Sequence, residues 1–199
     1  MIVWAGVLAA GRGSRLGGRP KALLVVGRQT FLETIARTAR DGGVVAVAVV
    51  LGAHGELVEP VARACCDAVV TNPAPERGMA SSAQVVARAL PPEASMLLWP
   101  VDTPLVTPAT VQTLIEASRI NADRVIIPVH GGRGHPPLLP PHVVEALRTM
   151  EHDARLDHTI ESAGGPPVLV DVDDSGVTFD VDIEADLARI RGKPTGFDS

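Results

Sequence analysis

A glycine-rich, basic segment near the start of the chain has the residue types that bind phosphate groups. Residues 7–21 read Val-Leu-Ala-Ala-Gly-Arg-Gly-Ser-Arg-Leu-Gly-Gly-Arg-Pro-Lys and follow an apolar run. Glycines let a backbone approach a ligand closely, and successive N–H groups can converge on an anion. We therefore expect this loop to bind a polyphosphate, with Arg15 and Lys21 neutralising its charge.

Two familiar phosphate-binding loops do not fit this segment. A Walker A loop needs Gly-Lys-Ser/Thr, whereas Lys21 follows Pro20 and precedes Ala22. A dinucleotide-binding fold needs glycines that open a helix and an acid at the end of the second strand. Residues 17–20, Gly-Gly-Arg-Pro, would break such a helix, and the second expected strand runs into Gly-Ala-His without a carboxylate.

Carboxylates that are distant in sequence are the candidate metal ligands. Asp102 follows a wholly apolar segment, and Asp180 and Asp182 lie near the other end of the chain. Mg²⁺ in proteins usually takes one or two carboxylates and completes its shell with water and phosphate oxygens. Capping of the next helix is the alternative role for Asp102, but Thr107 is better placed for it, since proline follows.

Apolar, β-branched runs alternate with helical stretches, which is typical of a parallel sheet covered on both faces. The expected strands are residues 2–8, 44–51, 68–71, 95–100, 124–129 and 168–171, with a further short strand at 177–179. The expected helices are residues 30–40, 56–64, 80–90, 108–118, 141–150 and 184–191. Residues 130–140, rich in glycine and proline, are expected to form an irregular excursion.

The expected sheet brings the candidate residues to one edge. The glycine-rich loop, Asn72, Asp102 and His135 each follow an expected strand, and Asp182 follows the short strand at 177–179. Ligands of open α/β sheets bind beyond the carboxyl ends of the strands. We therefore expect these groups to surround a single crevice.

Residues 7–24 resemble the signature of the GT-A-like nucleotidyltransferases, particularly the branch that attaches a nucleotide to molybdopterin. Later blocks resemble that branch in the same order: Asn72-Pro73 with Gly78-Met79 and Ser81-Ser82, Asp102-Thr103-Pro104, Gly134-His135-Pro136, and residues 180–187, Asp-Val-Asp-Ile-Glu-Ala-Asp-Leu. The last block departs from the family's Asp-Ile-Asp-Thr-Pro-Glu-Asp-Leu at Ile183 and Glu184. The resemblance implies one nucleotidyltransferase domain over residues 1–199, with a three-layer αβα, Rossmann-like, mostly parallel sheet.

The resemblance also implies a role for each matching residue. Catalysis is implied for Arg15, Lys21 and Asp102, and Mg²⁺ binding for Asp102 and Asp182. Nucleotide binding is implied for Leu8, Ala9, Ala10, Gly11, Gly13, Arg15, Lys21, Asn72 and Ser82. Acceptor binding is implied for Gly78, Met79, Ser81 and His135. Helix capping is the alternative role for Ser81 and Ser82.

The molybdenum cofactor cytidylyltransferases are the most similar branch. This resemblance implies Mg²⁺-dependent transfer of CMP from CTP to molybdopterin, release of pyrophosphate, and transient contact with a molybdoenzyme or its chaperone. Leu-Ala-Ala-Gly, where guanylyl enzymes tend to have Leu-Ala-Gly-Gly, favours cytidylyl transfer. A guanylyltransferase and a nucleotidyltransferase acting on a sugar phosphate remain open within the class. An NAD(P)-dependent oxidoreductase and a non-catalytic molybdenum cofactor carrier remain open outside it.

Composition restricts the partners further. The 199 residues are 46% hydrophobic, which is enough to bury one sizeable core. A net charge of −5 argues against nucleic-acid binding. There is no signal-peptide pattern and no apolar stretch of membrane-spanning length, so we expect a cytoplasmic protein that binds no membrane. With two Trp, three Phe and no Tyr, base recognition would rest on backbone amides and small polar side chains, and the adjacent Cys65 and Cys66 are expected to be structural.

Overall fold

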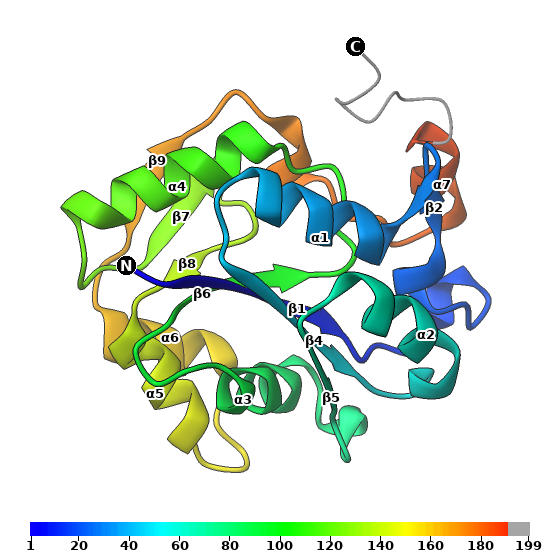
Figure 1. Ribbon diagram of the computed structural model, residues 1–199, viewed down its shortest axis with the longest axis horizontal. Helices are drawn as coiled ribbons and strands as arrows, with labels where there is room; N and C mark the ends of the chain where they lie inside the picture. Colours follow the sequence, from blue (N-terminus) through cyan, green and yellow to red (C-terminus); the bar gives the residue numbers. More distant parts are fainter. Residues whose placement is uncertain (191–199) are drawn as a thin grey trace.

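A mixed sheet forms the middle layer of the protein, as seen in the computed structural model, which describes residues 1–190 (Figure 1). Its seven strands lie in the order β5-β4-β1-β6-β8-β7-β9. The strands are β1 (Val3–Ala9), β4 (Ala46–Leu51), β5 (Ala68–Thr71), β6 (Ser95–Pro100), β7 (Ile126–Val129), β8 (Leu138–Leu139) and β9 (Val168–Asp171). β8 pairs antiparallel with β6 and β7, and the other pairs in this sheet are parallel.

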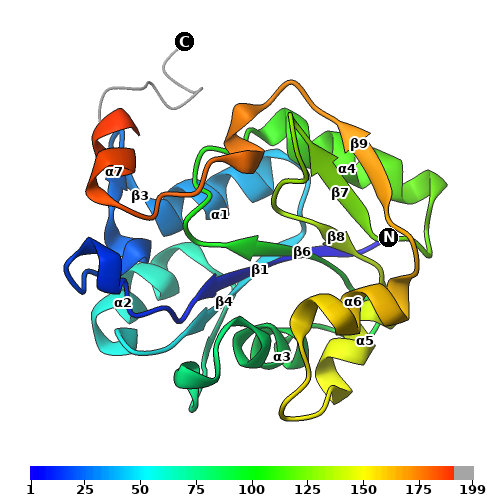
Figure 2. The same cartoon turned by 180° about the vertical axis from the view of Figure 1, so that it is seen from behind.

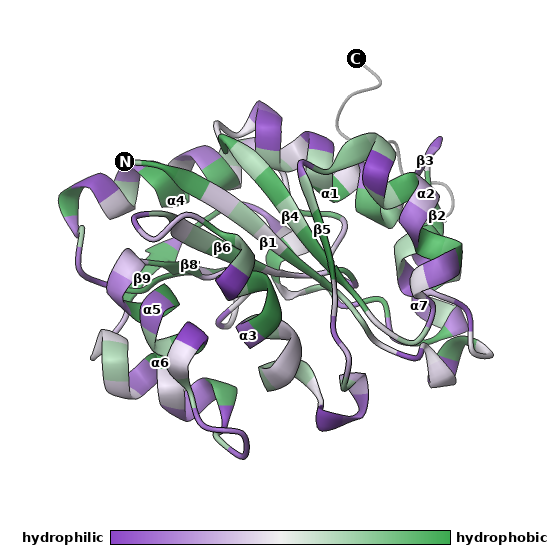
Figure 3. Cartoon of the chain, turned by 60° about the horizontal axis from the view of Figure 1, so that its bottom comes forward, coloured by the Kyte–Doolittle hydropathy of each residue, from purple (hydrophilic) through white to green (hydrophobic). Residues whose placement is uncertain are grey.

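Helices cover both faces of the sheet (Figures 1 and 2). One face packs against α1 (Phe31–Asp41), α2 (Gly55–Cys65) and α4 (Pro108–Ile120), and the other against α3 (Met79–Ala89), α5 (Pro141–Thr149) and α6 (Leu156–Gly164). The central strands are hydrophobic along most of their length (Figure 3), because strands covered on both faces bury both sets of alternating side chains. The expected three-layer αβα architecture is confirmed.

Successive side chains of β4 pack into the cores on opposite faces of the sheet. Val47, Val49 and Leu51 belong to the core beneath α1, α2 and α4. Ala48 and Val50 belong to the core beneath α3 and α5. The same holds for β1 and β6, which contribute residues to both cores and whose carboxyl ends carry the candidate site. No helix within residues 1–190 is long and apolar enough to cross a membrane.

Local sequence signals explain where the helices next to the site begin. Thr30 and Glu33 form a capping box at the start of α1. Thr107 accepts a hydrogen bond from the Thr110 N–H at 3.4 Å and precedes proline at the first position of α4, so its predicted capping role is confirmed.

Two expectations about the elements need correction, and two elements were missed. In place of the expected strand at 177–179 there is a 3₁₀ helix, η4 (Ser175–Thr178), because the Asp174 carboxylate caps its start by accepting a hydrogen bond from the Gly176 N–H. The irregular excursion over residues 130–140 contains β8, which inserts between β6 and β7. The hairpin of β2 (Val25–Val26) and β3 (Gln29–Thr30) and helix α6 were not expected.

The last described helix, α7 (Glu184–Ile190), lies beside the β2–β3 hairpin (Figures 1 and 2). Its expected end, Arg191, lies outside the described residues, as does the end of the expected domain over residues 1–199.

Candidate active site

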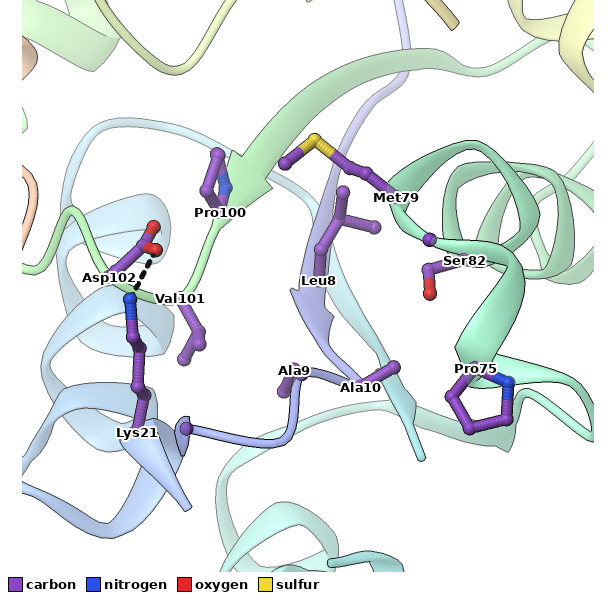
Figure 4. Close-up of a pocket in the computed structure, with 13 residues that line it drawn as sticks. Leu8, Ala9, Ala10, Lys21, Pro75, Met79, Ser82, Pro100, Val101 and Asp102 are labelled. Atoms are coloured by element: carbon purple, nitrogen blue, oxygen red, sulfur yellow. Dashed lines mark hydrogen bonds and ion pairs between the residues drawn. The ribbon is translucent and has the colours of Figure 1, made fainter. Parts of the chain in front are cut away.

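A pocket opens at the carboxyl ends of β1 and β6, where the glycine-rich loop faces the start of α3 (Figure 4). Its lining residues are Leu8, Ala9, Ala10, Gly11, Gly13, Lys21, Pro75, Gly78, Met79, Ser82, Pro100, Val101 and Asp102. Three segments distant in sequence, residues 8–21, 75–82 and 100–102, thus meet at the edge where α/β sheets bind ligands.

The glycine-rich loop makes a tight turn rather than opening a helix. Gly13, Gly17 and Gly18 have positive φ angles of 60°, 67° and 77°, which side chains disfavour. A side chain at Gly13 would also collide with the carbonyl oxygen of Arg19, whereas the space beside Gly11 is open. Only the three-residue 3₁₀ turn η1 (Ser14–Leu16) follows Gly13. The loop is therefore held by its glycines, with open space for a ligand beside its first glycine.

Lys21 joins the two carboxylates expected to bind metal. Its Nζ atom lies 2.8 Å from Asp102 Oδ2 and 2.6 Å from Asp182 Oδ1, and Figure 4 shows the first of these contacts. The Lys21 side chain is 18% exposed, compared with 42% for Asp182. Asp102 lies just beyond β6, as expected. Lys21, at the pocket wall, thus forms ion pairs with carboxylates from two distant segments.

A backbone hydrogen bond places Asp182 next to Asp102. The N–H of Val181 donates to the carbonyl oxygen of Asp102 at 2.9 Å. The buried carboxylate of Asp174 holds the preceding segment, because it accepts hydrogen bonds from Thr107 N–H at 2.8 Å and from the Thr110 hydroxyl at 2.6 Å. Long-range hydrogen bonds of Val181 and Asp174, rather than a strand, thus position Asp182 at the site.

Two arginines of the loop also pair with acids of the last segment. Arg15 Nη1 lies 3.2 Å from Asp182 Oδ2, and the Arg15 side chain is 72% exposed. Arg19 pairs with Glu184 instead. Arg15 therefore belongs to the Lys21 cluster, with enough freedom to meet a ligand, whereas Arg19 ties the loop to α7.

Hydrogen bonding controls the charges of this cluster. Hydrogen bonding from Lys21 lowers the pKa of Asp182. Burial disfavours the charged Lys21, yet its hydrogen bonds to both acids outweigh that cost and raise its pKa. For Asp180, partial desolvation and the neighbouring Asp102 charge raise the pKa. Lys21 and Asp182 are thus held in their charged forms.

The donor set suits a hard divalent cation. Within residues 1–190, no group of three or more His, Cys, Asp or Glu side chains could hold a metal ion. Two carboxylates with open coordination positions are the pattern for Mg²⁺ or Mn²⁺, whose shells water and phosphate oxygens complete. Asp102 and Asp182 would supply those carboxylates.

The block of Asn72, Gly78-Met79 and Ser81-Ser82 supplies three lining residues, Gly78, Met79 and Ser82, and a hydrogen-bonded layer behind them. Asn72 is 3% exposed and donates to the hydroxyls of Ser81 at 2.8 Å and Ser82 at 3.0 Å. Ser81 in turn donates to the Gly78 carbonyl at 2.8 Å. Asn72 and Ser81 are not among the lining residues of the pocket, so the ligand contacts expected of them stay predictions. Asn72 positions Ser82, which lines the pocket, and Ser81 ties Asn72 to the backbone of Gly78.

The residues expected to bind the acceptor divide between two places. Gly78 and Met79 line the same pocket as the glycine-rich loop, whereas His135 does not. The His135 N–H donates to Val177 at 2.7 Å, and its Nδ1 atom is buried without a hydrogen-bond partner among the described residues. His135 is therefore attached to η4 through Val177 and lies outside the pocket lining.

Sequence reasoning missed three lining residues. Pro100 and Val101 directly precede Asp102, so their position at the end of β6 was the signal that could have identified them. Pro75 lies in the short 3₁₀ turn η3 (Pro75–Arg77) between the matching motif residues. No signal in the residue type marks Pro75.

One protein-family model matches most of this chain. The model of the MobA-like NTP transferase domain matches residues 5–167. The chain belongs to this family. The matched segment contains Lys21, Asp102 and His135 and ends before Asp182, so the second carboxylate of the cluster is supplied by the chain beyond it.

Two curated relatives carry different activities in their names. Nicotine blue oxidoreductase of Paenarthrobacter nicotinovorans is 30% identical over 196 residues, covering 92% of this MobA-like chain and 94% of that protein. Molybdenum cofactor guanylyltransferase of Sinorhizobium fredii is 30% identical over 131 residues, covering 65% of this chain and 59% of that protein.

A solved structure matches the whole MobA-like fold. Rv0371c of Mycobacterium tuberculosis superposes with a TM-score of 0.80 at 28% identity, covering 98% of this chain and 100% of that one. A second structure of that protein, in complex with manganese, has a TM-score of 0.76 at 26% identity with the same coverage.

Proposed function

We propose that this chain transfers a nucleoside monophosphate, above all CMP from CTP, to a molybdopterin-type acceptor and releases pyrophosphate. The observation that carries the proposal is the contact of Lys21 with both Asp102 and Asp182 at the wall of a pocket formed by the glycine-rich loop. Nucleotidyl transfer needs this combination, because a dense negative charge must be neutralised and held in line.

In the proposed reaction a phosphate oxygen of the acceptor attacks the α-phosphorus of the triphosphate. The bond from that phosphorus to the bridging oxygen breaks, and the electron pair leaves with pyrophosphate. Gly11 and Gly13 would bring backbone amides to the phosphates, while Arg15 and Lys21 neutralise the charge that develops on the leaving group. An acceptor phosphate is already ionised at neutral pH, so no strong general base is required.

Asp102 and Asp182 would hold Mg²⁺, which supplies Lewis-acid stabilisation of charge on the phosphate oxygens. Support for a divalent ion comes from their hard oxygen donors and from the manganese complex of the similar mycobacterial protein. The remaining ligands would come from the triphosphate and water.

The nucleobase assignment rests on the pocket wall next to α3. Leu8, Pro75 and Met79 form an apolar surface there, and Ser82 adds a hydroxyl group (Figure 4). Ala10 also lines the pocket, where guanylyl enzymes tend to have glycine, and this favours the smaller cytosine. The named activity of the Sinorhizobium relative supports GTP as the alternative.

Pyrophosphate release tests the proposal directly. The protein is incubated with Mg²⁺, a molybdopterin-type acceptor and CTP, GTP, ATP or UTP in turn. Release with CTP alone supports cytidylyl transfer, and release with GTP keeps the transferase while replacing the nucleobase. No release with any of the four, with the acceptor shown intact, overturns the proposal and favours a non-catalytic carrier or an acceptor such as a sugar phosphate.

An oxidoreductase is the second candidate, because the relative that covers 92% of this chain is named as one. The tight turn at Gly13, followed by only a three-residue 3₁₀ turn, counts against dinucleotide binding, which uses the N-terminus of a full helix. Calorimetric titration with NADH, NADPH and CTP separates the candidates. Binding of a nicotinamide cofactor but not of CTP would favour the oxidoreductase.

A further inference from the structure

The Lys21 ammonium group takes the place of a cation between the two candidate metal ligands. Its Nζ atom lies 2.8 Å from Asp102 and 2.6 Å from Asp182. Among the described residues, these are the only two side chains with which it forms hydrogen bonds. With Arg15 3.2 Å from Asp182, two cations face two anions. The two cations offset the charges of Asp102 and Asp182, so a divalent ion gains less attraction on approaching these two ligands.

The same lysine lines the pocket where a triphosphate would lie. An ammonium group is a compact charge on a flexible four-carbon stem, so it can change partners without movement of the backbone. A triphosphate carries more negative charge than the two acids together. The two carboxylates take two of the three N–H donors of Lys21, so only one donor is left for a triphosphate while both contacts persist.

We propose that Lys21 exchanges between two sets of anions, the carboxylates in the empty site and the triphosphate in the nucleotide complex, so that nucleotide binding opens the metal site. This inference rests on the proposed function for the identity of both ligands. Its consequence is that metal and triphosphate each strengthen the binding of the other, as linkage requires. Metal alone binds weakly because the ammonium group holds its ligands.

The first test measures Mn²⁺ binding by electron paramagnetic resonance without nucleotide. Lys21→Met removes the competing ammonium group and should tighten Mn²⁺ binding by about tenfold or more. Arg19→Met is the matched control, since it removes one cation from the same loop, but one that pairs with Glu184. Equal Mn²⁺ affinity in Lys21→Met and the wild type overturns the proposal. Equal tightening in both variants also overturns it, since net charge would then explain the effect.

The second test measures CTP binding by calorimetry in EDTA, with no metal present. Asp102→Asn replaces an ion pair of Lys21 by at most a weaker, neutral hydrogen bond and should tighten CTP binding by about fivefold or more. Asp180→Asn removes a neighbouring charge of the cluster without a hydrogen bond to Lys21 and should have a smaller effect. CTP binding that is unchanged or weaker in Asp102→Asn overturns the proposal. Thermal melting of each variant verifies that it is folded.

Both tests measure binding rather than turnover, so they separate this inference from the proposed function. If both affinities change as expected while no nucleoside triphosphate yields pyrophosphate, the exchange stands and the transferase assignment fails. If pyrophosphate is released but Lys21→Met binds Mn²⁺ no better than the wild type, the transferase stands and the exchange fails.

Discussion

The backbone N–H of Val181 donates a hydrogen bond of 2.9 Å to the carbonyl oxygen of Asp102. This bond joins the end of β6 to the segment before α7, and it lies one residue before Asp182. Because Val181 is fully buried, the bond is shielded from water. The two carboxylates are therefore neighbours through the backbone as well as through Lys21.

Loss of either carboxylate should abolish turnover without unfolding the protein. Asp102→Ala and Asp182→Ala each remove a proposed metal ligand, so we expect pyrophosphate release to fall by at least about 100-fold. Asp123→Ala is the control, since it changes an exposed acid at the opposite edge of the sheet. Wild-type rates of pyrophosphate release in both Asp102→Ala and Asp182→Ala would contradict the assignment of these residues as metal ligands.

Reversal of the charge at Lys21 should act on phosphate rather than on the nucleoside. Lys21→Glu should weaken CTP binding by about tenfold or more, because an attraction becomes a repulsion, while cytidine binding changes little. Calorimetric titration with both ligands checks this expectation. An equal loss for CTP and cytidine would show that Lys21 supports the pocket as a whole.

Asp174 should be among the acids most important for stability. It is 6% exposed and accepts hydrogen bonds from Thr107, Thr110 and Gly176. Asp174→Ala leaves these donors unsatisfied and should lower the free energy of unfolding by about 2–4 kcal/mol. Urea denaturation measures the loss, and the exposed neighbour provides the control, since Asp173→Ala should cost less than about 0.5 kcal/mol. Similar losses in both variants would contradict this role.

The pKa of Asp182 should rise when Lys21 is replaced. Hydrogen bonding from Lys21 lowers this pKa, so Lys21→Met in metal-free buffer should move it up toward the ordinary carboxyl value. A carboxyl with a lowered pKa stabilises the fold above its unfolded-state pKa, and that stabilisation disappears as the pH falls through the folded-state pKa. Carbon-13 NMR of the Asp182 carboxyl across an acid titration measures the change. An unchanged pKa of Asp182 in Lys21→Met would show that Lys21 is not what lowers it.

Local patterns in the sequence determined much of the fold. The strands Ala68–Thr71, Ser95–Pro100 and Val168–Asp171 have the bounds expected from their apolar runs. The start of α4 follows its Thr-Pro signal. Gly17, Gly18 and Pro20 likewise indicated that no full helix begins after Gly13. These features depend on neighbouring residues alone, because periodicity, capping and turn chemistry act over a few positions.

The tertiary structure alone decided the composition of the site. Asn72 and Ser81 have the residue types of ligand-binding groups, yet their hydrogen bonds to each other and to Gly78 place them behind the pocket wall. β8, only two residues long, inserts between β6 and β7 through long-range pairing. Asp182 reaches Lys21 across 161 positions through bonds made by Val181 and Asp174. Such contacts join distant segments, and residue type and local spacing carry no record of which distant partner each group meets.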